Sequence, residues 1–292
     1  MKMTLCIFRL MALAGMAALF GLGQASAATG KGGIDYGNNA TVGKFVELNG
    51  NRFYYEEYGN GTPVLFIHGN GSSIADFKNQ IGVFARHHRV IAMDSRAQGK
   101  SAVGTEKLTY ELMAEDSNAF LEKLKLDHID VLGWSDGGII GLLLTIHHPD
   151  KVKMLAVLGA NLEPEAAYSW ATEGIVKVRA RINEALAQGK DAKPLQLQLQ
   201  LLDLLGEQPH IPLTALNQIR IPTLVMAGDR DVIKDEHTLA MFHAIQKSQL
   251  AIFPGATHVI PVQDPARFNQ TVLHFFDTPF AMPDTKDLGW FD

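Results

Sequence analysis

Cysteine is almost absent from this sequence of 292 residues, because Cys6 is the only one. Beyond Cys6 the chain has no thiol, so it offers neither a disulfide nor a cysteine nucleophile. Long runs of basic residues are missing as well, and the net charge is −5. A surface for nucleic acid or another polyanion is therefore not expected.

The spacings typical of zinc sites are also missing, since neither His-Glu-x-x-His nor Cys-x-x-Cys occurs in the chain. The pairs His87-His88 and His147-His148 each end a predicted helix, where a protonated imidazole suits the helix dipole. Gly99-Lys100-Ser101 imitates the end of a P-loop, but Asp94 stands where that motif has its leading glycine. We expect no metal and no organic cofactor.

Acidic residues are missing from the start of the chain, where Asp35 is the first. Lys2 and Arg9 precede the apolar stretch Leu10–Leu22, and Ala25-Ser26-Ala27 follows it. A basic start, a short apolar run and an A-x-A site form a secretory signal peptide, so we predict cleavage after residue 27 and export to the periplasm or the exterior. The alternatives are a first helix of the fold and a membrane anchor, although a span needs roughly 20 apolar residues. No stable membrane anchor is expected after cleavage.

The rest of the chain has the composition of a globular protein, with 47% hydrophobic and 20% charged residues overall. After the signal peptide at 1–27 we expect a flexible, glycine-rich lead at 28–43 and a main domain at 44–278. A tail at 279–292 ends the chain.

Short apolar runs recur along the main domain and indicate strands that are buried on both faces, as in a parallel sheet. These runs are Val64–Ile67, Val90–Met93, Ile129–Leu132, Met154–Leu158, Thr223–Ala227 and Leu250–Phe253. Segments with helical periodicity lie between them, at Ile74–Arg86, Tyr110–Leu124, Gly138–His147 and Pro265–Phe276. The alternation predicts an α/β fold with a mostly parallel, doubly wound sheet.

Two parts of the chain depart from this alternation. Lys44–Leu48 and Arg52–Tyr58 are joined at Asn49-Gly50, which predicts an antiparallel hairpin at the start of the sheet. The interval 162–220 has helical patterns at Ile175–Ala187 and Pro194–Leu205, so we predict a helical cap insertion. Leucine and glutamine alternate within it with the period of a strand, but these residue types favour a helix.

A candidate nucleophile follows the predicted strand Ile129–Leu132, in Gly133-Trp134-Ser135-Asp136-Gly137. A G-x-S-x-G sequence between a strand and a helix is a nucleophile elbow, in which the serine occupies a strained turn. Glycines on either side let the neighbouring backbone come close. Ser135 would then lie at a helix N-terminus, where backbone N–H groups favour a developing oxyanion.

A serine nucleophile needs a base and an acid that orients the base. The candidates for the base and the acid both follow predicted strands. In an open parallel sheet, the active site lies at the carboxyl ends of the strands. His258 is the predicted base, and Asp231 is the predicted acid. Asp229 is the second choice because it suits a turn, and Glu163 is the third.

The glycine-rich loop His68-Gly69-Asn70-Gly71 follows the strand Val64–Ile67. Such a loop turns a backbone N–H toward the serine, so we assign the oxyanion hole to the backbone N–H groups of Asn70 and Asp136. For His68 we favour a structural role over a catalytic one.

These motifs, together with the Asp94–Ser101 turn, resemble those of the α/β-hydrolase superfamily over about residues 44–277. The family usually has Arg-Gly-x-Gly-x-Ser in that turn, and Ala97 replaces its first glycine. Gly-Trp-Ser-Asp-Gly-Gly and Gly159-Ala160-Asn161 resemble the valacyclovirase-like (biphenyl-hydrolase-like) esterases. The resemblance implies an α/β-hydrolase fold and an esterase activity, and it is less specific for the substrate.

The predicted chemistry is acyl transfer to Ser135 from a small-molecule carboxylic ester. A serine nucleophile also leaves amidase, lactonase, C–C hydrolase and perhydrolase activities open, as well as a catalytically silent relative that binds a ligand. The carboxylate of Asp136 has two interpretations. It is either a contact for a substrate ammonium group, as in an α-amino-acid ester, or a residue that caps the nucleophile helix.

Overall fold

The computed structural model describes residues 33–289. The predicted signal peptide, the first residues of the lead and residues 290–292 lie outside this range. None of the helices in the described range is long and apolar enough to cross a membrane.

One sheet of eight strands forms the centre of the molecule, in the order β1-β2-β4-β3-β5-β6-β7-β8. The strands are β1 (Lys44–Leu48), β2 (Asn51–Tyr58), β3 (Thr62–Ile67), β4 (His88–Met93), β5 (Ile129–Trp134), β6 (Val152–Leu158), β7 (Thr223–Arg230) and β8 (Ser248–Thr257). β2 pairs antiparallel with β1 and with β4, and every other pair is parallel. The predicted fold class is confirmed.

The first hairpin has the predicted two-residue turn. Leu48 pairs with Asn51, and between them Asn49 and Gly50 have φ angles of 48° and 68°. Positive φ at both central positions defines a type I′ turn, whose twist matches that of the flanking strands.

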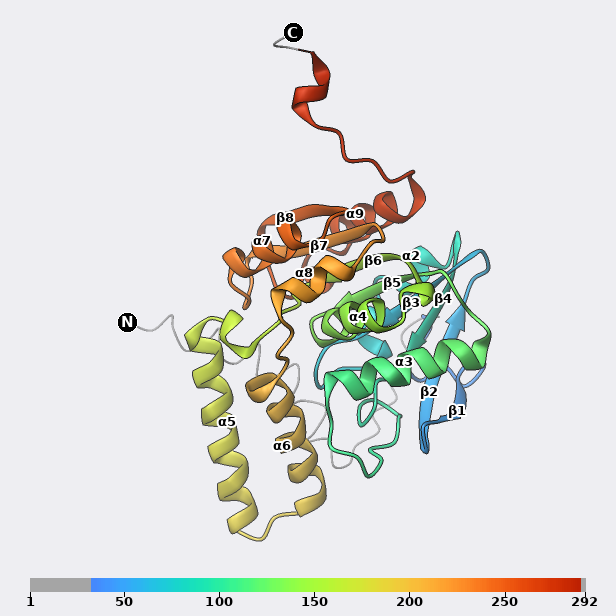
Figure 1. The fold of residues 1–292 in the computed structure, drawn as a ribbon. Coiled ribbons are helices and arrows are strands. Elements are labelled where there is room, and N and C mark those ends of the chain that lie inside the picture. Colours follow the sequence, from blue (N-terminus) through green and yellow to red (C-terminus); the bar gives the residue numbers. More distant parts are fainter. Residues whose placement is uncertain (1–32, 290–292) are drawn as a thin grey trace.

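Helices cover both faces of the sheet (Figure 1). The helices of the described residues are α2 (Ile81–Phe84), α3 (Tyr110–Leu124), α4 (Asp136–His147), α5 (Ser169–Ala187), α6 (Ala192–Glu207), α7 (Asp235–Ala244), α8 (Ile260–Gln263) and α9 (Pro265–Asp277), of which α5 and α6 lie beside the sheet. Short 3₁₀ turns are η1 (Ile74–Phe77), η2 (Pro149–Lys151), η3 (Pro164–Ala166), η4 (Leu213–Gln218) and η5 (Thr285–Leu288).

The single helix expected at Ile74–Arg86 is wrong, because η1 and α2 occupy this segment as two separate pieces. Contacts to distant parts of the chain fix the break. The Ile74 amide donates to Asp94 Oδ1, and the Gln80 side chain donates to the carbonyl oxygen of Pro261. These tertiary hydrogen bonds override the helical periodicity of the segment.

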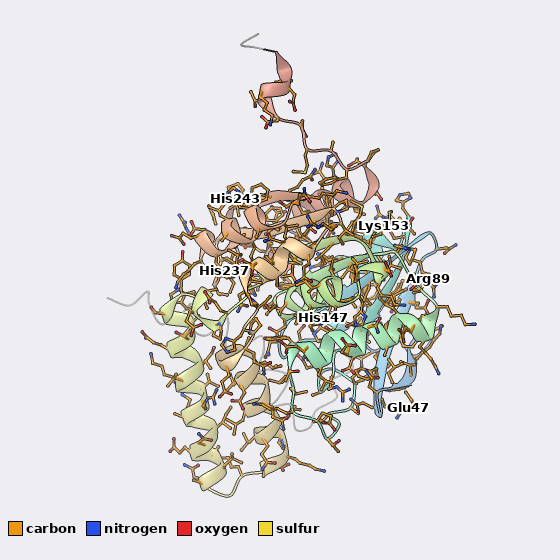
Figure 2. All side chains as sticks on the ribbon, viewed as in Figure 1. Glu47, Arg89, His147, Lys153, His237 and His243 are labelled. Atoms are coloured by element: carbon orange, nitrogen blue, oxygen red, sulfur yellow. The ribbon has the colours of Figure 1, made fainter. Side chains whose placement is uncertain are left out.

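Alternate side chains of each central strand enter opposite cores. Leu65 and Ile67 of β3 pack with α3 and α4, whereas Val64 and Phe66 pack with α2 and α9. Burying one such side chain stabilises the fold by about 1.5–3 kcal/mol. Charged side chains such as Glu47 and Lys153 point outward, with exposed fractions of 74% and 50% (Figure 2).

The interval 162–220 is helical in the structure, and its two long helices α5 and α6 form a hairpin beside the main body (Figure 1). Each has one fully buried side chain, Ile182 in α5 and Leu204 in α6. The alternating leucines and glutamines lie within α6, so the helical interpretation of that pattern is confirmed.

The two ends of the described chain behave differently. The lead was expected to be flexible, but residues 37 and 39 donate backbone hydrogen bonds to the buried Glu56 carboxylate of β2, at 2.8 and 2.9 Å. Beyond α9 the chain leaves the body, and Met282 and Leu288 are exposed there (Figure 1).

Candidate active site

Ser135 forms the turn between β5 and α4 and has the strained backbone angles φ 57° and ψ −120°. A non-glycine residue in this region costs about 1–3 kcal/mol, which the surrounding structure must supply. A side chain at Gly133 would collide with the backbone of Gly137, and one at Gly137 would collide with the backbone of Ile67. Both glycines are therefore needed for the serine to reach its position at the N-terminus of α4.

His258 and Asp231 come from the loops after β8 and β7 and form a close pair. His258 Nδ1 lies 2.7 Å from Asp231 Oδ1. Asp231 also accepts hydrogen bonds from the backbone amides of Val232 and Ile233, at 2.7 and 3.2 Å. The carboxylate is therefore fixed and orients the imidazole ring.

Charge and burial act in opposite directions on this pair. Burial favours a raised pKa for Asp231, but the adjacent His258 and the hydrogen bonds outweigh it, so the pKa of Asp231 is lowered. For His258, burial favours a lowered pKa, but the carboxylates of Asp231 and Asp136 outweigh it, so the pKa of His258 is raised.

The other two candidate acids lie elsewhere. Asp229 and Glu163 are both exposed, and neither side chain contacts His258 among the hydrogen bonds of the described residues. The structure thus places Asp231, the first-choice acid, beside His258 and leaves Asp229 and Glu163 away from it.

Two contacts hold the His258 loop against the nucleophile turn. Trp134 Nε1, from the residue before Ser135, donates to the carbonyl oxygen of His258 at 2.9 Å. A Cβ atom at Gly159 would lie 2.6 Å from His258 Nδ1, so the ring fits only because residue 159 has no side chain. Within residues 33–289, His258 Nε2 and Ser135 Oγ are not hydrogen-bonded; such bonds often tighten only when substrate binds.

The loop from His68 to Gly71 passes beside the serine, since a Cβ atom at Gly69 would lie 3.1 Å from Ser135 Cβ. His68 Nε2 accepts from the Ser95 amide at 3.0 Å, and His68 Nδ1 lies 2.8 Å from the Gly69 carbonyl oxygen. Because Nε2 accepts, Nδ1 has the hydrogen that faces the Gly69 carbonyl oxygen. These contacts fit the structural role favoured for His68.

Asp136 is buried, with 2% of its surface exposed. Its Oδ2 accepts from Asn70 Nδ2 at 2.9 Å. Burial raises the pKa of Asp136 to about 6, although Asn70 and the nearby Tyr110 hydroxyl act in the opposite direction. Sequence reasoning missed Tyr110, because an aromatic residue at the start of a helix has the pattern of an ordinary core residue.

The turn after β4 contacts the His68 loop through the Ser95 amide. Ala97 has a φ of 65°, so it keeps the left-handed conformation although it lacks the glycine usual in the family. Arg96 forms a fully buried two-point ion pair with Asp116 of α3, with both N–O distances 2.6 Å. Lys100, the lysine of the P-loop imitation, instead lies over the ring of Tyr54, 4.5 Å from its centre.

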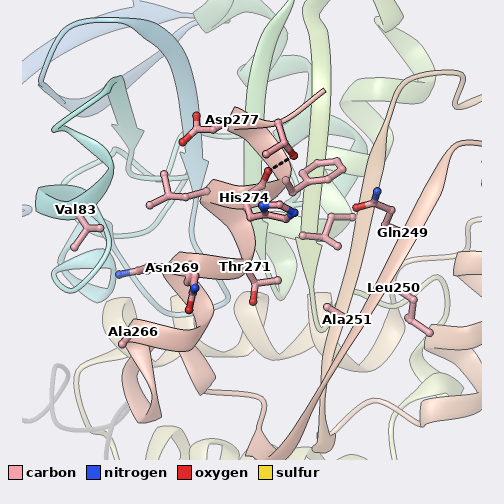
Figure 3. Close-up of a pocket in the computed structure, with 14 residues that line it drawn as sticks. Val83, Gln249, Leu250, Ala251, Ala266, Asn269, Thr271, His274 and Asp277 are labelled. Atoms are coloured by element: carbon pink, nitrogen blue, oxygen red, sulfur yellow. Dashed lines mark hydrogen bonds between the residues drawn. The ribbon is translucent and has the colours of Figure 1, made fainter. Parts of the chain in front are cut away.

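A cavity of about 910 Å³ lies away from these residues, between β8 and α9 (Figure 3). Gln249, Ala251 and His274 line it, whereas Ser135, Asp231 and His258 do not. A smaller hollow of about 310 Å³ adjoins Asp231 and is walled by Tyr168 and Trp170 at the base of the cap. The described residues contain no cluster of three or more His, Cys, Asp or Glu side chains that could hold a metal ion.

The sequence pattern of the alpha/beta hydrolase fold family matches residues 62–215. The chain is 27% identical to the 2-hydroxy-6-oxo-6-(2'-aminophenyl)hexa-2,4-dienoic acid hydrolase of Metapseudomonas resinovorans, over 81% of this chain and 91% of that protein. It is 26% identical to Serine hydrolase BPHL of Homo sapiens, over 82% of this chain and 88% of that protein.

A solved structure of a serine hydrolase involved in carbazole degradation (the CarC enzyme) is also similar. Its TM-score is 0.68 and its identity 28%, over 81% of this chain and 98% of that one. Because the family pattern spans over half of the sequence and the strand arrangement agrees with it, this chain belongs to the α/β hydrolase family.

Proposed function

We propose that this hydrolase cleaves small-molecule carboxylic esters through an acyl-enzyme on Ser135, with His258 as the base and Asp231 as the acid that orients it. The observation that carries the proposal is the 2.7 Å contact between His258 and Asp231 beside the strained Ser135 turn. A nucleophile, a base and an orienting acid at the carboxyl ends of parallel strands are the parts that acyl transfer needs.

In the first half of the reaction, His258 Nε2 takes the Ser135 proton while Oγ attacks the ester carbonyl carbon. The backbone N–H groups of Asn70 and Asp136 hold the resulting oxyanion. The tetrahedral intermediate collapses, the alcohol leaves with the proton from His258, and the acyl group stays on Oγ. In the second half, water gives a proton to His258 and attacks the acyl carbon; the bond to Oγ then breaks, the acid leaves, and His258 returns its proton to Ser135.

Carbon–carbon bond hydrolysis is the second candidate. The substrate named for the Metapseudomonas relative has a ketone and no ester, so its hydrolysis must break a carbon–carbon bond. The same serine, histidine and oxyanion hole would serve such a reaction, with His258 delivering its proton to carbon instead of oxygen.

A substrate panel tests these proposals. The purified protein is assayed with p-nitrophenyl acetate and butyrate, a lactone and a 2-hydroxy-6-oxo-dienoate, and Ser135→Ala and His258→Ala serve as controls. We expect ester turnover that each substitution nearly abolishes, with the double variant little worse than either, because the residues act as a unit. Turnover of the dienoate alone supports the second candidate, and no turnover at all indicates a ligand-binding relative.

The carboxylate of Asp136 would favour esters that have an ammonium group near the scissile bond. A substrate ammonium group near this carboxylate would form a close ion pair, worth roughly thirty- to a hundredfold in specificity. The measurement is the ratio of kcat/KM for an aminoacyl ester to that for its des-amino analogue, in the wild type and in Asp136→Asn. A ratio near one in both proteins contradicts an ammonium contact.

We further propose that the chain is exported by its N-terminal segment. The enzyme would then meet its small-molecule substrate outside the cytoplasm. A nucleic-acid partner is not proposed, because the chain lacks runs of basic residues.

A further inference from the structure

We infer that the Asn70 side chain couples the cap helix α6 to the nucleophile turn, so that Asn70 is a positioning residue for the oxyanion hole. The inference rests on the proposed function, because the Asn70 backbone N–H binds an oxyanion only in the proposed acyl-transfer reaction. It assigns the side chain a role separate from that of the backbone.

The amide group of Asn70 bridges two distant parts of the chain. Its Nδ2 donates to Asp136 Oδ2 at 2.9 Å and to the carbonyl oxygen of Leu201 at 3.0 Å. A primary amide nitrogen has two hydrogens, so both are in use. Since the amide carbon Cγ is only two bonds away from Cα of residue 70, fixing the amide group restricts the direction of the Asn70 backbone N–H.

The first acceptor is rigid. Asp136 directly follows Ser135, begins α4 and is 2% exposed. The Tyr110 hydroxyl lies beside the same carboxylate. A buried carboxylate without such donors would carry a large desolvation penalty, so Asp136 holds Asn70 strongly in turn.

The second acceptor belongs to a less firmly held element. Leu201 lies within α6, where Leu204 is the one fully buried residue, and Leu197 and Leu201 pack only partly against the main core. At the end of α6 the Gln208 side chain donates to the Leu108 carbonyl oxygen at 3.2 Å, two residues before Tyr110. The contacts of Leu201 and Gln208 therefore both reach the surroundings of Asp136, whereas Arg179 of α5 pairs with Asp203 and Glu207 of α6 and joins the two cap helices to each other.

It follows that the seating of α6 and the geometry of the oxyanion hole depend on each other. When α6 moves outward, Asn70 loses one acceptor and its loop gains freedom. Coupling of this kind is reciprocal, so a ligand in the oxyanion hole must in turn stabilise α6.

Reciprocity gives a direct test with a trifluoromethyl ketone, which adds to a reactive serine and places an oxyanion in the hole. Hydrogen exchange of residues 195–207 is followed by mass spectrometry in full-length protein with and without the ketone. We expect the ketone to slow exchange of α6 in the wild type. This protection should be largely lost in Asn70→Ala, which keeps the backbone N–H.

Two variants provide controls. Asn161→Ala removes an amide that makes only a local hydrogen bond, to the Glu163 carbonyl oxygen at 2.9 Å, and should be protected like the wild type. Asp136→Asn keeps an oxygen that accepts from Asn70 and should retain most of the protection. Asn70→Ser, which reaches at most one acceptor, replaces the alanine variant if that variant is unstable.

Kinetics provide a second readout. Asn70→Ala should lower kcat for p-nitrophenyl acetate by roughly tenfold with little change in KM, because the effect is felt in the transition state. Equal protection of α6 in the wild type and in Asn70→Ala, or an unchanged kcat, overturns the inference. A wild-type protein that neither turns over esters nor binds the ketone instead overturns the proposed function.

Discussion

At the scale of single residues, the candidate catalytic groups stand in recognisable motifs, whereas the residues that contact and support them do not. Ser135, Asp231 and His258 each follow a strand in a recognisable motif, and the structure places Asp231 beside His258. Tyr110, Gly159 and the side chain of Asn70 were missed as parts of the site. Their roles depend on contacts with residues far along the chain, Tyr110 and Asn70 with Asp136 and Gly159 with His258, which no local pattern encodes.

The choice of acid gives the first prediction. Asp231→Asn should lower kcat by roughly 10⁴-fold, because the neutral amide favours the wrong histidine tautomer. Asp229→Asn should leave kcat near the wild-type value, since Asp229 is exposed. Steady-state kinetics of both variants decides, and a large loss in Asp229→Asn with an active Asp231→Asn contradicts the assignment.

The pH dependence of kcat/KM gives the second prediction. His258 must be neutral to accept the Ser135 proton, so activity is lost as the pH falls through its pKa. The carboxylates of Asp231 and Asp136 raise that pKa. Removing the charge in Asp136→Asn should therefore move the acidic limb of the profile to lower pH, and an unchanged limb or one moved to higher pH would argue against this electrostatic account.

At the scale of elements, the strands were predictable because strands buried on both faces leave short, wholly apolar runs. The helix α7 was not predicted, since only Thr238 and Met241 are buried in it and its apolar periodicity is weak. The break between η1 and α2 was not predictable either, because Asp94 and Pro261, which fix it, lie far along the chain.

The buried ion pair between the β4 turn and α3 gives an element-scale prediction. Asp116→Ala should lower the free energy of unfolding by about 3–5 kcal/mol, because it leaves the Arg96 guanidinium buried without its partner. The matched control is Asp127→Ala, whose pair with Lys151 is at the surface and should be worth at most about 1 kcal/mol. Urea unfolding measures both, and similar losses in the two variants contradict the prediction.

Gly159, in the turn after β6, gives a second prediction at the scale of elements. Gly159→Ala places a methyl group against the His258 ring, at a residue whose φ is 61°, so kcat should fall strongly and stability should fall as well. Gly174→Ala is the control, because Gly174 lies inside α5 with open space around it. That change should be neutral or stabilise by up to about 1 kcal/mol, and an active Gly159→Ala variant would contradict the packing seen here.

At the scale of the whole molecule, the mostly parallel sheet, its antiparallel start and the helical insertion agree with the fold predicted from the sequence. The candidate site lies at the carboxyl ends of β5, β7 and β8, beside the helical insertion, and the cavity between β8 and α9 lies elsewhere. Substrate preference was not predictable, because α5 and α6 are positioned by contacts such as Asn70 with Leu201.

Export is the prediction at this scale. Expressed in a bacterium, the protein should leave the cytoplasm and begin at Ala28, as intact-mass measurement would show. A soluble cytoplasmic product that retains Met1 contradicts it.

The most direct test of the central claim is to trap the acyl-enzyme. The wild type and Ser135→Ala are mixed with p-nitrophenyl butyrate, quenched in acid within the burst phase and mapped by peptide mass spectrometry. We predict that the wild type carries one butyryl group on Ser135 after releasing one equivalent of p-nitrophenol in the burst, and that the variant shows neither. A burst that persists in Ser135→Ala, or a butyryl group on another residue, would contradict it.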